Sequence, residues 1–244
     1  MTKNRKHYIK ERYSKYWINA RKDIYKITPY DKAVIKLLKS LPSFKILEVG
    51  IGTGEVIAES FISDKEVNGV DISDNLISRC KELFPKINAE VGDAENLFFK
   101  DALFDLVYCI HTTWYFPDLK KAIFEMLRVT KKGGYVVFDI QNIQNYEINK
   151  NYKKHKYENS NFFGKFYKTC KNFIKFILRN GIIEWDFAIY EVPSNPFSII
   201  NELRLKKIDD FKTLIPMEKD NLTTLIEIQS DFDKYPRIIF LIKV

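Results

Sequence analysis

The sequence is poor in the residues that disulfide-bonded, metal-binding and membrane-spanning proteins use. The three cysteines, Cys80, Cys109 and Cys170, are odd in number, form no C-x-x-C pair and have apolar neighbours, so we expect small core residues in a reducing compartment. His7 and His155 lack ligand-like neighbours, which predicts no metal site. No apolar run approaches the roughly 18 residues that a membrane helix needs, and no apolar segment follows the basic start. We therefore expect a cytoplasmic chain without a transmembrane segment.

Positive charge is abundant, with a formal net charge of +8, but it is unevenly placed. Residues 150–181 hold nine Lys or Arg against one acidic residue, and residues 1–22 hold eight against one, so acidic residues outnumber basic ones elsewhere. Two basic flanks predict a positive field for an anionic partner, such as a phosphorylated substrate, nucleic acid or anionic lipid. The alternative is lysine-rich composition on solvated faces.

Strand and helix patterns alternate along the first part of the chain. Thr28, Pro29 and Asp31 mark the start of a helix that precedes the first strand. The alternation predicts a parallel sheet covered by helices on both faces. We expect strands at 44–49, 67–72, 87–91, 104–110 and 135–140, helices between them, and residues 131–134 as the end of the last of these helices.

Residues 141–184 break this alternation and read as an inserted amphipathic lid with a Phe and Tyr face and lysines 165, 168, 171 and 175 mostly elsewhere. The sequence predicts a single domain over 1–244. Its parts are an N-terminal helical arm (1–43), a cofactor-binding core (44–140), the lid or substrate insertion (141–184) and C-terminal strands (185–244). The C-terminal part begins with segment 185–192. We expect a capped helix near 196–203, a strand near 205–211 and a final strand near 235–244 to follow it.

Glycine is scarce, nine in all, yet three of the nine fall in ILEVGIGTGE, residues 46–55. A parallel sheet binds ligands beyond the carboxyl ends of its strands. Glycines there let ligand atoms approach the backbone, and the following helix presents free N–H groups. The spacing G-x-G-x-G differs from the dinucleotide pattern G-x-G-x-x-G, so the loop predicts a nucleotide-like cofactor without naming it.

Three acidic residues extend this predicted site. Asp71, at the end of the second strand, is placed to accept hydrogen bonds from ribose hydroxyls; otherwise it is a capping or turn aspartate, although Ser73 can already cap the next helix. Glu48 lies inside an apolar strand, where a carboxylate is costly unless a cation, such as an amino group of the ligand, pairs with it. Asp93 is placed to accept from an exocyclic amine, or it belongs to an ordinary Gly-Asp turn.

Together, E-x-G-x-G-x-G, V-D-I-S, G-D-A-E and FD-L-V resemble the class I S-adenosylmethionine-dependent methyltransferases, in the small-molecule, type 11-like branch, over residues 44–140. The resemblance implies a Rossmann-like, seven-stranded, mostly parallel sheet with its last strand antiparallel between the fifth and sixth. A dehydrogenase becomes a distant alternative. The resemblance also implies S-adenosyl-L-methionine as cofactor, with Gly50, Gly52 and Gly54 along its methionine part, Asp71 on the ribose, Ile72 on the adenine face, Asp93 and Ala94 at the adenine edge, and Cys109 and Ile110 completing the set.

Methyl transfer needs an aligned acceptor in a site without water, and an O or N acceptor also needs a base. His111, just past the fourth strand, is the candidate base; the alternative is a loop histidine satisfied by the backbone. Tyr115 is the second candidate catalytic residue, although with Trp114 it is expected mainly to line the acceptor pocket. The loop IHTTWYF lacks the [D/N/S]-P-P-[Y/F/W] tetrapeptide of amino-directed nucleic-acid methyltransferases.

Three hypotheses follow for the function. The leading one is an enzyme that methylates an O or N atom of a small molecule, such as a sugar nucleotide or secondary metabolite, in one version an anionic molecule that meets the lid lysines. The second is an RNA methyltransferase that uses both basic flanks. The third is a non-catalytic binding protein on the same fold. The sequence does not specify an oligomeric state.

Overall fold

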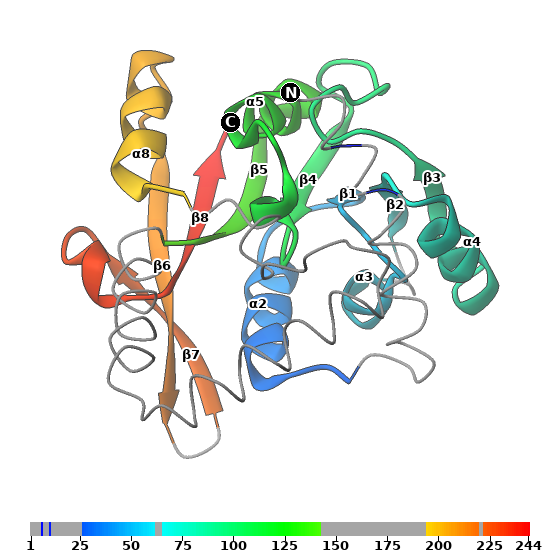
Figure 1. Ribbon diagram of the computed structural model, residues 1–244, viewed down its shortest axis with the longest axis horizontal. Helices are drawn as coiled ribbons and strands as arrows, with labels where there is room; N and C mark the ends of the chain where they lie inside the picture. The colour runs from blue at the N-terminus through cyan, green and yellow to red at the C-terminus, as the bar shows by residue number, and fades with distance from the viewer. Residues whose placement is uncertain (1–5, 7–9, 11–25, 62–64, 143–193, 220–221) are drawn as a thin grey trace, which may run out of the picture.

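A single mixed sheet organises the molecule. The computed structural model describes residues 6, 10, 26–61, 65–142, 194–219 and 222–244 (Figure 1). The strand order is β3-β2-β1-β4-β5-β8-β6-β7, in which the first five strands are parallel and β8 is antiparallel between β5 and β6. The strands are β1 (Lys45–Val49), β2 (Glu66–Asp71), β3 (Asn88–Val91), β4 (Phe104–Cys109), β5 (Thr130–Gln141), β6 (Phe211–Lys219), β7 (Leu222–Ile228) and β8 (Arg237–Lys243).

The parallel core and the antiparallel placement of the last strand are confirmed, but the expected count of seven strands is wrong. The eighth strand, β7, pairs antiparallel with β6 at the sheet edge, where most of its side chains are not buried. The strand expected near 205–211 was also placed too early. Residue Leu205 still belongs to a helix, Lys207 adopts a left-handed φ of +58° in the turn that follows, and β6 begins only at Phe211.

Five α-helices and two short 3₁₀ helices have described bounds. The helix starts expected at Thr28 and Ser73 are capped by the side chains of those residues, and the capped helix expected near 196–203 has Asn195 as its cap. At the first of these starts, Thr28 and Asp31 form a reciprocal capping box. The helices are α2 (Pro29–Ser40), α3 (Glu55–Phe61), α4 (Asp74–Leu83), α5 (Leu119–Val129) and α8 (Pro196–Leu205), with η1 (Thr113–Tyr115) and η3 (Phe232–Lys234).

The segment expected to end the fourth helix is instead the start of a strand. Helix α5 stops at Val129, and β5 already includes Lys131 and Gly134. The Lys131 ammonium donates to the Asp105 carboxylate on β4 at 2.7 Å, so it supports strand pairing and does not stabilise a helix end. The predicted end of this helix is therefore wrong by a few residues, because the lysines that follow its apolar face belong to the next strand.

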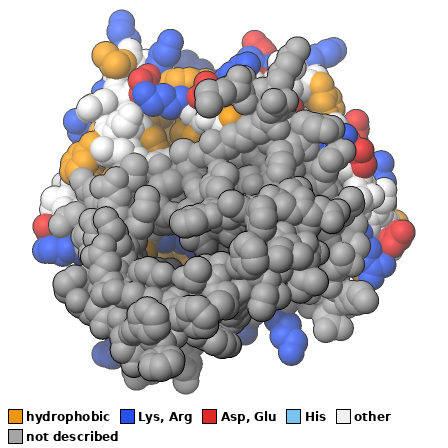
Figure 2. Space-filling model, viewed as in Figure 1, with side chains coloured by type: hydrophobic (Ala, Val, Ile, Leu, Met, Phe, Trp, Pro, Cys, Tyr) orange, Lys and Arg blue, Asp and Glu red, His pale blue; other side chains and the backbone are white. Residues whose placement is uncertain are grey.

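The two faces of the sheet carry separate apolar clusters. Helices α2, α3 and α4 cover one face with residues such as Val34, Leu38 and Ile57, while α5 and α8 cover the other with residues such as Met126 and Leu203. Cys80 and Cys109 are buried free thiols. Figure 1 shows β3 and β7 at opposite edges of this layered arrangement. Figure 2 shows charged side chains of both signs, interspersed with hydrophobic ones, along the described rim of one face.

The carboxyl ends of β1, β2, β3, β4 and β5 meet at one edge of the sheet, which is where parallel α/β folds bind ligands. Because β8 runs in the opposite direction, its first residue, Arg237, lies beside the last residue of β5, Gln141, at the same edge.

The expected lid (141–184) and the segment 185–192 lie, apart from residues 141 and 142, outside the described residues. None of the described helices is long and apolar enough to cross a membrane.

Candidate functional site

The glycine loop after β1 has the left-handed backbone that its composition predicts. Gly50 and Gly52 have φ values of +77° and +57°. A Cβ added at Gly50 would lie 2.4 Å from the Thr112 side chain, whereas one added at Gly52 would meet nothing within 4 Å. Gly50 therefore permits close packing of the loop that follows β4, and Gly52 leaves open space in front of the backbone for a ligand.

Asp71 fixes this loop to the end of β2. One oxygen of its carboxylate accepts a hydrogen bond from the Gly52 N–H at 3.0 Å, and the other accepts from the Ser73 N–H at 2.9 Å. The residue is only 7% exposed, yet it lines a pocket. Asp71 is thus both the turn aspartate of the alternative interpretation and a carboxylate at the edge of a ligand site.

The pocket lies where four parallel strands end, and its open space is about 550 Å³, solvent at its mouth included. Residues just beyond β1, β2, β3 and β4 line it, so sequence-local loops converge there. The enclosed cavity itself is only about 50 Å³, well below the roughly 300 to 1,000 Å³ of a site that holds a small ligand, so a cofactor requires the pocket to open further. The lining residues are Lys6, Val49, Gly50, Val70, Asp71, Ile72, Gly92, Asp93, Ala94, Glu95, Thr112, Tyr115, Phe116 and Pro117.

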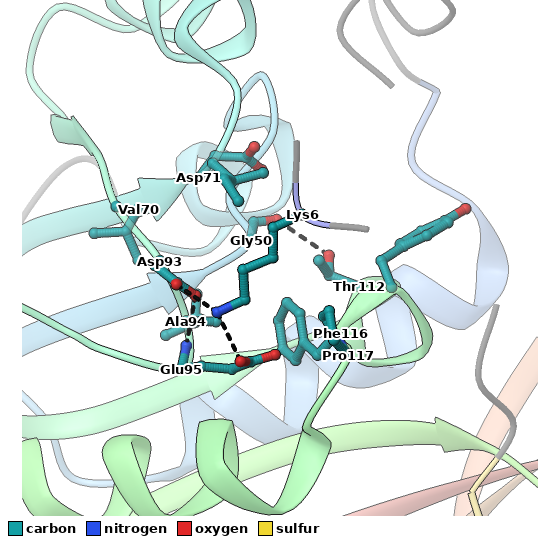
Figure 3. Close-up of a pocket in the computed structure, with 14 residues that line it drawn as sticks. Lys6, Gly50, Val70, Asp71, Asp93, Ala94, Glu95, Thr112, Phe116 and Pro117 are labelled. Atoms are coloured by element: carbon teal, nitrogen blue, oxygen red, sulfur yellow. Dashed lines mark hydrogen bonds and ion pairs between the residues drawn. The ribbon is translucent and has the colours of Figure 1, made fainter. Parts of the chain in front are cut away.

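Lys6 crosses this pocket, which the sequence did not lead us to expect. Its ammonium lies 2.6 Å from the carboxylate of Asp93 and 2.6 Å from that of Glu95 (Figure 3). Glu95 also accepts from the Asp118 N–H at 2.8 Å, and its own N–H donates to Asp93 at 2.9 Å. Burial lowers the pKa of Lys6, but the two carboxylates outweigh burial and raise it overall. A cation of the chain itself thus occupies the position expected to recognise the adenine edge.

The predicted site residues divide into those that line the pocket and those that do not. Gly50, Asp71, Ile72, Asp93, Ala94 and Tyr115 line it. Gly52 and Gly54 shape the loop, while Cys109 and Ile110 are buried at the end of β4. Glu48 is buried beneath the loop, where it accepts a hydrogen bond from the Tyr108 hydroxyl at 3.1 Å.

Among the residues that the structure describes, no cation pairs with the Glu48 carboxyl. Burial raises its pKa well above the usual range, and the hydrogen bond from Tyr108 offsets only part of that shift. A protonated carboxyl inside the strand removes the cost of a buried charge. The role of Glu48 toward a cationic ligand group stays a prediction.

His111 lies one residue before Thr112, and its backbone is held in a left-handed conformation with φ +64°. Its N–H donates to the Asp139 carboxylate on β5 at 2.9 Å, and its ring Nε2 lies 2.6 Å from the Asp31 carboxylate on α2. Burial raises the pKa of Asp31, but hydrogen bonds from His111 and Thr28 outweigh it and lower the pKa to about 2. The candidate base is therefore oriented by an ionised carboxylate, as the base is in many hydrolytic and transfer sites.

Sequence reasoning missed Lys6 and Asp31 as parts of the site. Lys6 lies 87 residues from Asp93, and Asp31 lies 80 residues from His111. No local spacing connects partners this distant. Asp31 was recognised only as part of a helix start, and its second partner depends on how α2 packs against the sheet.

A family model described as a methyltransferase domain matches residues 47–138. The chain is 29% identical over 116 residues to the sterol 4-C-methyltransferase strm-1 of Caenorhabditis elegans, covering 45% of this chain and 34% of the relative. It is 27% identical over 180 residues to the demethylmenaquinone methyltransferase of Thermotoga maritima, covering 72% and 71%. The first listed relatives are matched over roughly a third to a half of their own length.

Among solved structures, the fold is similar to that of a Thermotoga maritima S-adenosylmethionine-dependent methyltransferase described as a possible histamine N-methyltransferase. That likeness has a TM-score of 0.59, 18% identity, and covers 100% of both chains. The fold is therefore the Rossmann-like one of that structure. The domain match over residues 47–138 agrees with the resemblance to S-adenosylmethionine-dependent methyltransferases.

The residues present suit S-adenosylmethionine, whose reactive group is an electrophilic methyl on a sulfonium. Its ribose hydroxyls and exocyclic amine are donors, and the carboxylates of Asp71 and Asp93 at the pocket wall are acceptors. Gly50 brings the backbone itself to the pocket wall, whereas Gly52 lies outside the lining. Lys6 is the one lining residue that does not fit, because its cation competes for the same acceptor.

Proposed function

We propose that this chain is a methyltransferase that transfers the methyl group of S-adenosylmethionine to a small molecule. The observation that carries the proposal is the convergence of the open glycine loop, Asp71 and Asp93 on one pocket beyond the parallel strands. The matched domain supports the reaction type. The first relatives are matched only in part, so the activity of the whole protein is proposed from the pocket and the domain together.

The acceptor is proposed to be a small molecule because relatives carry names of that kind, a sterol and demethylmenaquinone among them. The sequence favours an O or N atom of a sugar nucleotide or secondary metabolite, and its basic segments allow an anionic acceptor. One relative's name specifies a carbon. Product analysis should therefore test methylation of carbon as well as of oxygen and nitrogen.

Calorimetric titration of S-adenosylmethionine tests the first half of the proposal. We expect one saturable site in the wild type and at least roughly tenfold weaker binding in Asp71→Asn, because charge-assisted hydrogen bonds are worth about 1.5 to 3 kcal/mol. Asp74→Asn is the matched control. Asp74 begins α4 close by in sequence, is not among the pocket-lining residues, and its removal should leave affinity within about twofold. A folded wild-type protein that binds no cofactor would refute the enzyme and favour a non-catalytic binding protein.

Acceptor screening tests the second half. Radiolabelled cofactor is incubated with metabolite extracts and with RNA, and the product is separated before and after ribonuclease. Label that survives ribonuclease in a small-molecule fraction supports the proposal. Ribonuclease-sensitive label, with binding that falls steeply as salt rises, would replace it with the RNA alternative, because phosphate contacts release counterions.

A further inference from the structure

A half-buried cation, Arg237, lies at the first residue of β8 beside the candidate base His111, next to the residues that line the pocket but not among them. The guanidinium carbon of Arg237 lies 4.6 Å from the ring centroid of Tyr30 and 5.1 Å from that of Trp114, so two aromatic rings flank it. The side chain is 25% exposed. An arginine held against aromatic rings with part of its surface open is pre-organised to meet a ligand.

The protein itself satisfies little of this guanidinium. Its nearest carboxylate is Asp139, 3.7 Å from Nε, which is too long for a hydrogen bond. The two Asp139 oxygens already accept from the Tyr30 hydroxyl and the His111 N–H, each at 2.9 Å. Among the described residues, Arg237 donates from Nη1 to His111 Nδ1 at 3.2 Å and also hydrogen-bonds with the Tyr30 hydroxyl. A guanidinium has five N–H donors, so these two contacts leave capacity for an oxyanion.

The contact also fixes the tautomer of His111. Arginine can only donate, so His111 Nδ1 must be the unprotonated, accepting nitrogen, and Nε2 carries the proton toward Asp31. Both ring nitrogens are therefore engaged within the protein. The lone pair that a general base needs is present at Nδ1, but Arg237 covers it.

A second polar group at this strand end lacks a partner. Gln141 lies directly opposite Arg237 in the antiparallel pairing of β5 with β8, so the two side chains share one face of the sheet. The Gln141 Oε1 atom is buried and has no hydrogen-bond partner in the part of the chain that the structure describes. Buried acceptors of this kind are rare and call for an explanation. A hydroxyl of a bound acceptor would supply the missing donor.

We propose that Arg237 binds an oxyanion of the methyl acceptor, and that this contact draws the guanidinium from His111 Nδ1 so that His111 can accept the acceptor's proton. The inference rests on the proposed function and adds a substrate class, small molecules with a carboxylate, phosphate or phenolate. In the balanced reaction, the acceptor X–H bond breaks and its proton goes to Nδ1. The X electron pair forms the bond to the methyl carbon, and the C–S pair stays on sulfur.

Asp31 completes this arrangement as a positioning residue. Its carboxylate is fully buried and lies 2.6 Å from Nε2, so it holds the proton on Nε2 and turns Nδ1 toward Arg237. The charged groups that face His111 are thus Asp31 from α2, Asp139 from β5 and Arg237 from β8. An acceptor without an oxyanion leaves Arg237 on Nδ1 and the base covered, which makes the same contact a device for specificity.

Long-range ¹H–¹⁵N spectra of protein labelled at its three histidines test the inference without turnover. His111→Gln assigns the His111 signals. The probes are benzoate, inorganic phosphate and 4-nitrophenolate, added separately with S-adenosylhomocysteine present. In the free protein we expect a protonated Nε2 and an unprotonated Nδ1. At least one probe should shift Nδ1 saturably, and the probe that does so identifies the oxyanion class.

Arg237→Met should weaken that probe's binding by about tenfold or more, because hydrogen bonds to charged groups are the strong ones. Arg237→Lys keeps the positive charge but loses the planar guanidinium that can donate two hydrogen bonds to one oxyanion, so it should restore only part of the affinity. The matched control is Arg79→Met, which removes an exposed arginine paired with Glu82 on α4 and should leave the titration unchanged.

An Nδ1 signal that no probe shifts, or that shifts equally in a folded Arg237→Met variant, would overturn the inference. Calorimetry with S-adenosylhomocysteine separates this failure from failure of the proposed function. If the wild type binds the nucleoside but no probe reaches Nδ1, only the role of Arg237 is wrong. If the nucleoside does not bind at all, the methyltransferase proposal itself falls.

Discussion

Removing the Lys6 ammonium should tighten cofactor binding. Lys6 spans the Asp93 and Glu95 carboxylates at 2.6 Å each, in the pocket proposed for the adenine. An exocyclic amine that donates to Asp93 must first displace this cation. Lys6→Met leaves a side chain of similar length that offers no donor, so the cost of displacement disappears.

The structure sets the size of the effect. The Lys6 side chain is 25% exposed, that of Asp93 is 35% exposed and that of Glu95 is 7% exposed, so the two pairs lie between surface and buried ion pairs. Exposed pairs contribute about 0.2 to 1 kcal/mol each, which gives about 0.4 to 2 kcal/mol for the two together. We therefore expect affinity to rise about 2- to 30-fold in Lys6→Met, with a smaller gain at high salt.

Calorimetric titrations of S-adenosylmethionine and S-adenosylhomocysteine at two salt concentrations measure this gain. Lys10→Met is the matched control, since Lys10 belongs to the same N-terminal stretch but pairs with Asp74, which is not among the residues that line the pocket. The control should change affinity by less than about twofold. Weaker binding in Lys6→Met would refute the competition and show that Lys6 helps to hold the cofactor. An unchanged affinity would show that the ion pairs do not oppose binding.

Three further substitutions test the physical reasoning. Gly50→Ala should destabilise the protein by about 1 to 3 kcal/mol more than Gly133→Ala in urea unfolding, because both have left-handed φ but only the first meets the Thr112 side chain; equal losses would contradict this. Burial raises the folded pKa of Glu48 above its ordinary 4.5, so above pH 4.5 the folded state holds a proton that the unfolded state has released. The free energy of unfolding of the wild type should therefore fall as pH rises above 4.5, by up to about 1.4 kcal/mol per pH unit. Glu48→Gln should flatten that fall. Asp31→Asn should cost about 2 kcal/mol at neutral pH, a difference that vanishes as pH falls from 3.8 toward 2.

Most of the fold could be predicted because its signals are local. Strands β1 and β4 are mostly apolar and buried on both faces, and capping residues precede α2, α4 and α8. Edge strand β7 was missed for the opposite reason. Its residues alternate between exposed and half-buried, so neither a buried run nor a clear apolar face distinguishes it from a loop.

The cofactor side of the site was predictable for a topological reason. In a parallel sheet, the residue that follows each strand is delivered to the same edge, so Gly50, Asp71 and Asp93 converge although each was recognised only from its own strand end. The residue types and their positions at the strand ends were therefore enough to predict the cofactor side of the site. Lys6 could not be recognised in this way, because its partners depend on where an N-terminal stretch crosses the finished pocket.

The acceptor side follows a different rule, and that difference bears on specificity. Arg237 reaches His111 across 126 residues of sequence only because the antiparallel β8 inserts beside β5 and begins where β5 ends. Asp31 reaches the same histidine from a helix that precedes the first strand. If these residues select the acceptor, two segments outside the matched domain (47–138) control it. Domain likeness then predicts the reaction type and leaves the acceptor open, since substitutions at Arg237 or Asp31 can change specificity while every residue of the cofactor pocket stays the same.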